Sequence, residues 1–181
     1  MKMPHVVAMM LVPIAAIIAG CATVPDVSML SVPVSIKVPE NEVLLLTAQA
    51  TGVQIYECSA KKNDPMRFEW AFKAPEAELY DKAGRKIGSH YAGPTWESND
   101  GSKVIGEVRS RDNGPDASAI PWLLLSAKST VGTGILGQTR SIQRVNTIGG
   151  IAPADVCSQA KAGQVARVNY KATYYFFTAK P

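Results

Sequence analysis

The sequence predicts an all-β chain, a single antiparallel β-sandwich or barrel-like domain with one short helix near its C-terminal third. Polar and apolar residues alternate over 67–73 and again over 167–178, which is the pattern of strands with one buried face. Short segments of this kind recur with turn residues between them. Regular spacing of short strands is typical of sandwiches and barrels, and we favour the sandwich slightly.

The N-terminal half of the domain is predicted to consist of strands joined by tight turns. Strands are expected at 42–50 and 53–58, with Thr51-Gly52 as the turn between them. A hairpin is expected at 95–109, because Asn99-Asp100-Gly101 separates two strand segments and an Asp-Gly pair supplies the positive φ angles of a hairpin turn.

The C-terminal half contains two further strand segments, a helix and the longest strand. Residues 121–127 are continuously apolar and 140–147 alternate, so both are expected to be strands. A helix is predicted at 154–162, opened by Pro153 and ended by Gly163. The strand 167–178 should bury one face, which consists of Val168, Tyr170, Ala172, Tyr174, Phe176 and Thr178.

The N-terminus has the pattern of a bacterial lipoprotein leader. A weakly basic start and an apolar stretch too short to span a membrane precede Ile18-Ala19-Gly20-Cys21, which matches a lipobox. We therefore expect residues 1–20 to be a signal peptide, Cys21 to be lipidated, 21–34 to be a tether and 35–181 to be the β domain. The expected location is the bacterial cell envelope, lipid-anchored, in the outer membrane and facing the periplasm.

The charge of the chain is modest and spread along its length. The 181 residues include 19 basic and 15 acidic side chains, and loss of Lys2 with the leader would leave 18 against 15. No basic run interleaves with aromatic residues, so nucleic acid is not an expected partner. The expected partners are the membrane, through the lipid on Cys21, and a glycan or small molecule; no cofactor is predicted.

Cys58 and Cys157 remain if a lipid occupies Cys21, which makes an even pair in an oxidising compartment. A disulfide between them would close a loop of about 100 residues, worth roughly 4–5 kcal/mol in loop-entropy estimates. Two buried free thiols or a redox pair are the alternatives, although no C-x-x-C motif supports a redox pair.

The densest group of functional side chains is His90, Tyr91, Trp96 and Glu97 around Gly93-Pro94. The Gly-Pro pair should interrupt the strand and expose the aromatic residues at a rim, where flat rings could cover a sugar or a small ligand. A β-turn stabilised by aromatic packing is the alternative. Exposed aromatic side chains beside loops are frequent in binding sites.

A second candidate surface lies beside the glycine-rich bend at Gly149-Gly150. Arg144 and Asn146 precede this bend, and an arginine fork there could hold a carboxylate or phosphate. Gln143 could contribute to the same surface. The alternative is an arginine on a solvated strand face.

No catalytic residue and no metal site are predicted. Glu97 with Glu107 could support glycoside hydrolysis, but nothing fixes the separation of the two carboxyl groups. His90, Glu97 and Asp100 supply too little nitrogen or sulfur for a typical zinc site. The G-x-G-x-x-G match at 132–137 lacks a following helix, so it indicates a loop. The function expected first is ligand binding or a structural role; a carboxylate hydrolase near His90–Glu97 and an envelope scaffold are the alternatives.

Several segments resemble the DUF3455 family over about residues 35–178. These segments are 52–58 (GVQIYEC), 90–96 (HYAGPTW), 120–124 (IPWLL), 141–147 (SIQRVNT) with Gly149-Gly150, and 172–176 (ATYYF). The family is defined by sequence and has no established activity. The resemblance implies a single secreted or envelope-exposed domain and assigns no catalytic role to any residue.

Overall fold

The computed structural model describes residues 32–181. The predicted signal peptide 1–20, the lipidation site Cys21 and most of the tether 21–34 lie outside the described residues. Within 32–181, no helix has the length and apolarity needed to cross a bilayer.

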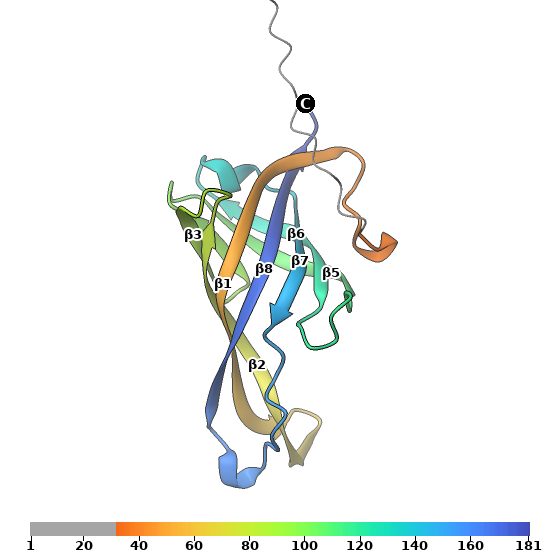
Figure 1. Cartoon of the computed structure of the whole chain (residues 1–181), viewed down its shortest axis with the longest axis vertical. Coiled ribbons are helices and arrows are strands. Elements are labelled where there is room, and N and C mark those ends of the chain that lie inside the picture. Colours follow the sequence, from red (N-terminus) through yellow and green to blue (C-terminus); the bar gives the residue numbers. More distant parts are fainter. Residues whose placement is uncertain (1–31) are drawn as a thin grey trace, which may run out of the picture. The chain divides into compact units, whose positions relative to one another are not determined.

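The described chain forms one closed antiparallel barrel, in which each strand pairs with its neighbours in sequence and β1 pairs with β8. Of the two predicted architectures, the barrel is therefore the one observed. The long strands β1, β2 and β8 extend well beyond the shorter ones (Figure 1). The strands are β1 (Glu42–Lys61), β2 (Asp64–Tyr80), β3 (Lys86–Tyr91), β4 (Thr95–Ser98), β5 (Lys103–Asp112), β6 (Trp122–Val131), β7 (Ser141–Gly149) and β8 (Val165–Ala179).

The predicted turn at Thr51-Gly52 is wrong, because β1 continues through it as one strand. Gly52 lies between Ala77 of β2 and Tyr170 of β8 in the ladder. A Cβ on Gly52 would lie 2.5 Å from the Ala77 Cα, closer than real side chains approach. The glycine therefore permits a close approach of two strands, which is the other common reason for a glycine inside a strand.

The main core of the barrel is formed by side chains that point inward at alternate positions along the strands. Trp96 is 1% exposed and lies against Gly106, where a Cβ would come within 2.8 Å of the indole. The predicted inward face of β8 is confirmed for its central residues. The main core consists of Ala48, Ala50, Ala77, Leu79, Trp96, Val104, Ile120, Leu123, Leu125, Leu136, Ile142, Tyr170, Ala172, Tyr174 and Phe176.

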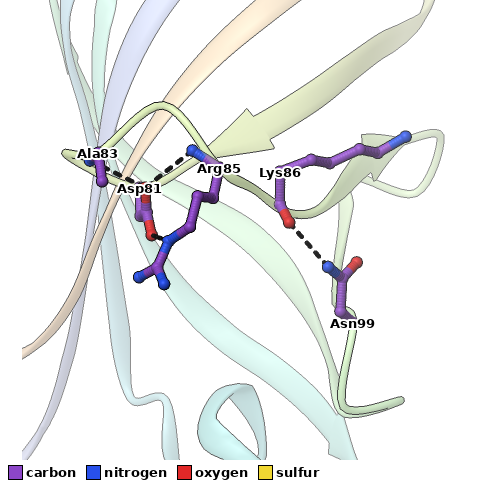
Figure 2. A network of polar contacts seen from close by, with 5 residues as sticks. All are labelled: Asp81, Ala83, Arg85, Lys86 and Asn99. Atoms are coloured by element: carbon purple, nitrogen blue, oxygen red, sulfur yellow. Dashed lines mark hydrogen bonds and ion pairs between the residues drawn. The ribbon is translucent and has the colours of Figure 1, made fainter.

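A network of polar contacts closes the turn between β2 and β3 (Figure 2). The Asp81 carboxylate accepts hydrogen bonds from the backbone N–H groups of Ala83 and Arg85, both at 2.9 Å. Asn99, in the turn between β4 and β5, donates to the carbonyl oxygen of Lys86 at 2.8 Å. Two hairpins are thus joined at this end, and the predicted Asn99–Gly101 turn is confirmed.

The outer wall of the barrel carries a small second core. The segment containing the 3₁₀ turn η1 (Val34–Ile36) packs on β6 and β7, where Ile36 contacts Trp122 and Val145. Gln143 is buried here and donates a hydrogen bond to the Ile36 carbonyl at 2.7 Å. Gln143 therefore holds the N-terminal segment and does not extend toward a ligand surface.

The predicted helix at 154–162 is not formed; only a 3₁₀ turn, η3 (Gln159–Lys161), is present there. The segment is held against β1 by hydrogen bonds from Cys58 N–H to the Gln164 carbonyl and from Gly163 N–H to the Cys58 carbonyl, both 2.9 Å. The Cys58–Cys157 disulfide is present as predicted, with Cα atoms 5.5 Å apart. These tertiary contacts override the local helix signals.

Candidate functional site

The barrel contains a cavity of about 550 Å³ that borders the main core. Its lining is mostly apolar and aromatic, with a small number of polar side chains and no carboxylate. The lining residues are Gln54, Tyr56, Phe72, Lys73, Pro75, His90, Gly93, Pro94, Trp96, Val108, Arg111, Ile120, Pro121, Leu123, Leu125, Arg144 and Tyr174. A cavity of this size and composition is typical of small-molecule sites.

The cavity opens through the wall where β3 and β4 are short. Pairing of β2 with β3 ends at Ala77, and pairing of β4 with β5 ends at Thr95 opposite Ile105. Beyond these points the strand segments 72–75 and 108–111 have no neighbour on the facing side. From these segments, Phe72, Lys73, Pro75, Val108 and Arg111 line the cavity. The opening is therefore a direct result of unequal strand lengths.

The chain after β7 is fixed beside the cavity at Gly150. A bridge joins Ala119 to Gly150, and the hydroxyl of Tyr56, a lining residue, donates to the Gly150 carbonyl at 2.7 Å. Gly150 has a φ of +80°, and a Cβ would lie 2.7 Å from the Tyr170 Cβ, so only glycine fits here. The glycine-rich bend noted in the sequence thus holds Tyr56 in the lining of the cavity.

His90 is buried in the barrel wall and is 3% exposed, so the prediction of an exposed rim is wrong for this residue. Its ring stacks on Trp96 with centroids 4.3 Å apart, and its Nδ1 lies 2.8 Å from the Thr95 carbonyl. A carbonyl only accepts, so Nδ1 carries the hydrogen. Burial lowers the pKa of His90 to about 3; the bond to Thr95 opposes this shift, and the positive charge of Arg144 adds a smaller lowering that is included in the value.

Trp96 and Tyr174 form an aromatic group with His90 in the wall of the cavity. Trp96 is also buried instead of exposed, with its ring 5.3 Å from that of Tyr174. Trp96 Nε1 is a buried donor without a hydrogen-bond partner in the described residues. The Tyr174 hydroxyl lies beside Tyr170 and Arg144, and the Gln54 amide lies beside Tyr170. Unpartnered buried polar groups cost free energy, which makes them informative at a cavity wall.

Arg144 enters the cavity from β7, between Leu123 of β6 and Tyr174 of β8 in the ladder. Its Nε and Nη2 donate to the Pro121 carbonyl at 3.1 and 2.8 Å, which fixes the guanidinium. None of the ion pairs within residues 32–181 involves Arg144. Burial raises the pKa values of Tyr56 and Tyr174, and the positive charge of Arg144 partly offsets this rise.

The structure separates the predicted site residues into two groups. His90, Trp96 and Arg144 line the cavity. Tyr91 and Glu97 point to the outer surface, where the Tyr91 hydroxyl donates to Glu97 at 2.7 Å. Asn146 is exposed with φ of +51° at an irregularity of the β7–β8 ladder, so it serves the strand geometry and not the cavity.

The acidic residues weighed for hydrolysis or metal binding are dispersed on the surface. Glu97 pairs with Lys103 at 3.0 Å and Glu107 pairs with Arg109 at 3.1 Å. Asp100 accepts from the Ser102 and Ile135 backbone N–H groups and fastens the 132–137 loop, which holds the 3₁₀ turn η2 (Ile135–Gln138). Among residues 32–181, no three His, Cys, Asp or Glu side chains gather into a cation site.

Sequence reasoning missed Gln54, Tyr56 and Tyr174 as cavity residues. Tyr174 lies on the predicted inward face of β8, which the alternation assigns to the core. On β1, however, the inward residues Gln54 and Tyr56 alternate with the outward Val53 and Ile55. The apolar-inside rule selects the wrong face here, because Gln54 and Tyr56 are among the few polar side chains that border the cavity.

Fold and cavity together define a small single-domain antiparallel β-barrel with an internal binding chamber. The family model "Protein of unknown function (DUF3455)" matches residues 39–178, and the chain belongs to this family. No curated protein matches the chain, and no solved structure does.

Proposed function

We propose that this protein is a lipid-anchored protein of the bacterial cell envelope whose barrel binds a small organic molecule. The binding function depends on one observation, the internal cavity of about 550 Å³. Proteins usually fill the interior of an eight-stranded barrel with side chains or hold one small ligand there. The second arrangement agrees with the opening between β2 and β5 and with the half-buried Arg144 in the lining, which takes part in none of the ion pairs of residues 32–181.

The envelope location is supported by two features that lie far apart in the sequence. The lipobox at Ile18–Cys21 predicts export and acylation. The Cys58–Cys157 disulfide suits an oxidising compartment such as the periplasm. Attachment by two or more acyl chains would keep the barrel at the membrane, because a single chain anchors only marginally.

Entry through the side opening provides a test of the binding function. The full chain in dilute detergent is titrated with the neutral fluorescent probe N-phenyl-1-naphthylamine, with protein-free detergent as the blank. Val108 lines the opening and is 42% exposed, so Val108→Trp should narrow the entrance without disturbing the core. We expect the variant to bind the probe at least about tenfold more weakly than the wild type.

The matched control is Val131→Trp, because Val131 is 53% exposed near the other end of the barrel wall. This variant should bind the probe like the wild type, and both variants should melt as the wild type does. Equal binding by all three proteins would place the probe elsewhere and contradict the cavity as the site. If the wild type binds neither neutral nor charged probes, the binding function is refuted, and interaction with protein partners is the function to test next.

A further inference from the structure

We propose that the cavity accepts an organic monocarboxylate with an apolar body, and that Arg144 holds the carboxylate. This inference rests on the proposed function and names the class of its ligand. It follows from the charge of the lining, from the kind of polar atoms that the walls present, and from the position of Arg144 relative to the opening.

The charges on the lining select a single negative charge. Three cationic side chains and no carboxylate border the cavity. Lys73 is already paired with Glu57 at 3.0 Å, and Arg111 is an exposed residue at the opening. Arg144 is half-buried and takes part in none of the ion pairs of residues 32–181. One interior cation without a counter-charge is matched by a monoanion.

The hydrogen-bond donors of the lining favour a ligand that accepts hydrogen bonds. Arg144 uses Nε–H and one Nη2–H on Pro121, which leaves three N–H groups, two of them on Nη1. The edge formed by Nη1 and Nη2 is the one that binds a carboxylate with two parallel hydrogen bonds. The Tyr174 hydroxyl lies beside the Arg144 guanidinium and Tyr170, and burial raises the pKa of Tyr174, so this hydroxyl stays protonated.

The other polar residues of the lining are less available to a ligand. Gln54 is 2% exposed and Trp96 is 1% exposed, and their side-chain N–H groups are buried in the wall. Arg144 is half-buried and lines the cavity, so its free N–H groups are the donors that a carboxylate would meet.

The order of strands places the anion deep in the barrel and the apolar body toward the opening. In the closed order of eight strands, β7 and β8, which carry Arg144 and Tyr174, lie across from the short pair β3 and β4. The opening lies at that short pair. The remaining lining that a ligand body would meet is largely apolar and includes Ile120, Leu123, Leu125, Phe72 and Val108.

The test compares acids with their uncharged amides on the full chain in dilute detergent, by isothermal titration calorimetry. The pairs are cinnamate with cinnamamide, 4-phenylbutyrate with its amide, and 2-naphthoate with 2-naphthamide. The wild type should prefer at least one acid over its amide by roughly 10- to 100-fold, the range expected for hydrogen bonds to a charged group. Arg144→Gln should remove this preference and leave amide binding unchanged.

Two further variants keep the test decisive if Arg144→Gln fails to fold. Tyr174→Phe keeps the ring and removes only the hydroxyl beside Arg144, so the variant should fold and should weaken binding of the acid more than binding of the amide. Arg109→Gln removes a surface cation that does not line the cavity, and it should leave the acid preference intact. Together these variants separate local recognition from a general effect of net charge.

The outcomes distinguish failure of the monocarboxylate inference from failure of the proposed binding function. Equal binding of every acid and its amide by the wild type would overturn the monocarboxylate inference, while the binding function would stand. An acid preference that survives in Arg144→Gln would remove Arg144 from the site and overturn the inference. Absence of binding for all six compounds, together with absence of binding for the neutral probe, would instead refute the proposed function.

Discussion

Burial of His90 makes the stability of the barrel depend on pH in a range where no other side chain of residues 32–181 normally titrates. The ring is 3% exposed and is neutral when folded, because burial lowers the pKa of His90 to about 3. An unfolded histidine has a pKa near 6.5. Below pH 6.5 the unfolded state therefore takes up a proton that the folded state excludes, and the free energy of unfolding falls as the pH falls.

The size of the effect follows from the two pKa values. With one unit of pKa worth about 1.4 kcal/mol, stability should fall by about 2 kcal/mol between pH 7 and pH 5. The loss continues until the pH approaches the folded value of about 3. Carboxylates whose pKa is lowered in the fold, such as Glu97 with its bond from Tyr91, lose their contribution only below about pH 4.5. The window above pH 5 thus reports on His90 alone.

The assay is urea unfolding of the full chain at pH 7, 6 and 5, followed by tryptophan fluorescence. His90→Gln is the matched variant, because an amide can still donate to the Thr95 carbonyl but does not titrate in this range. Its stability should change little over the same pH range. Equal stability of the wild type at pH 7 and pH 5, or the same slope in His90→Gln, would refute the burial argument.

Three further perturbations test the fold and the anchor. Replacing Cys58 and Cys157 together by Ser opens a loop with a sequence separation of 99. The free energy of unfolding, measured with urea, should fall by about 4–5 kcal/mol. A fall below about 1 kcal/mol would show that the segment around Cys157 is held without the disulfide. Gly106→Val places a side chain where a Cβ alone lies 2.8 Å from Trp96, so unfolding should become easier by about 1–3 kcal/mol, and an unchanged melting temperature would contradict the packing described. Cys21→Ala should release the protein from membranes in cell fractionation, and continued membrane attachment would rule out the lipid anchor.

The sequence predicted the β class, one hairpin, the inward face of β8 and the disulfide, because these depend on local signals or on simple pairing. Alternation alone identifies Tyr170 to Phe176 as an inward face, and Asp100-Gly101 is a turn by its own chemistry. With Cys21 set aside for lipidation in the prediction, only one bridge is possible between the two remaining cysteines, and this is the one observed.

The site was harder to predict, because its residues depend on neighbours that lie far away in the chain. Gly93-Pro94 does interrupt the wall, but Trp96 turns inward because Gly106 on the next strand leaves room for the indole. Gln54 and Tyr56 face inward at the cavity, and the local alternation of β1 does not indicate that a cavity lies there. The 154–162 segment has helix start and stop signals, yet the hydrogen bonds with Cys58 hold its end against β1.

Closure of the barrel by its first and last strands has a consequence for synthesis and folding. Glu42 lies opposite Ala179, so the ladder that completes the barrel joins nearly the whole length of the described chain. Pairing over such a separation is slow to form, and until it forms β1 has one free edge that can pair with another molecule. A chain that ends before β8 would therefore be an open sheet with two unprotected edges, prone to aggregate, so completion of β8 decides whether the protein is recovered folded.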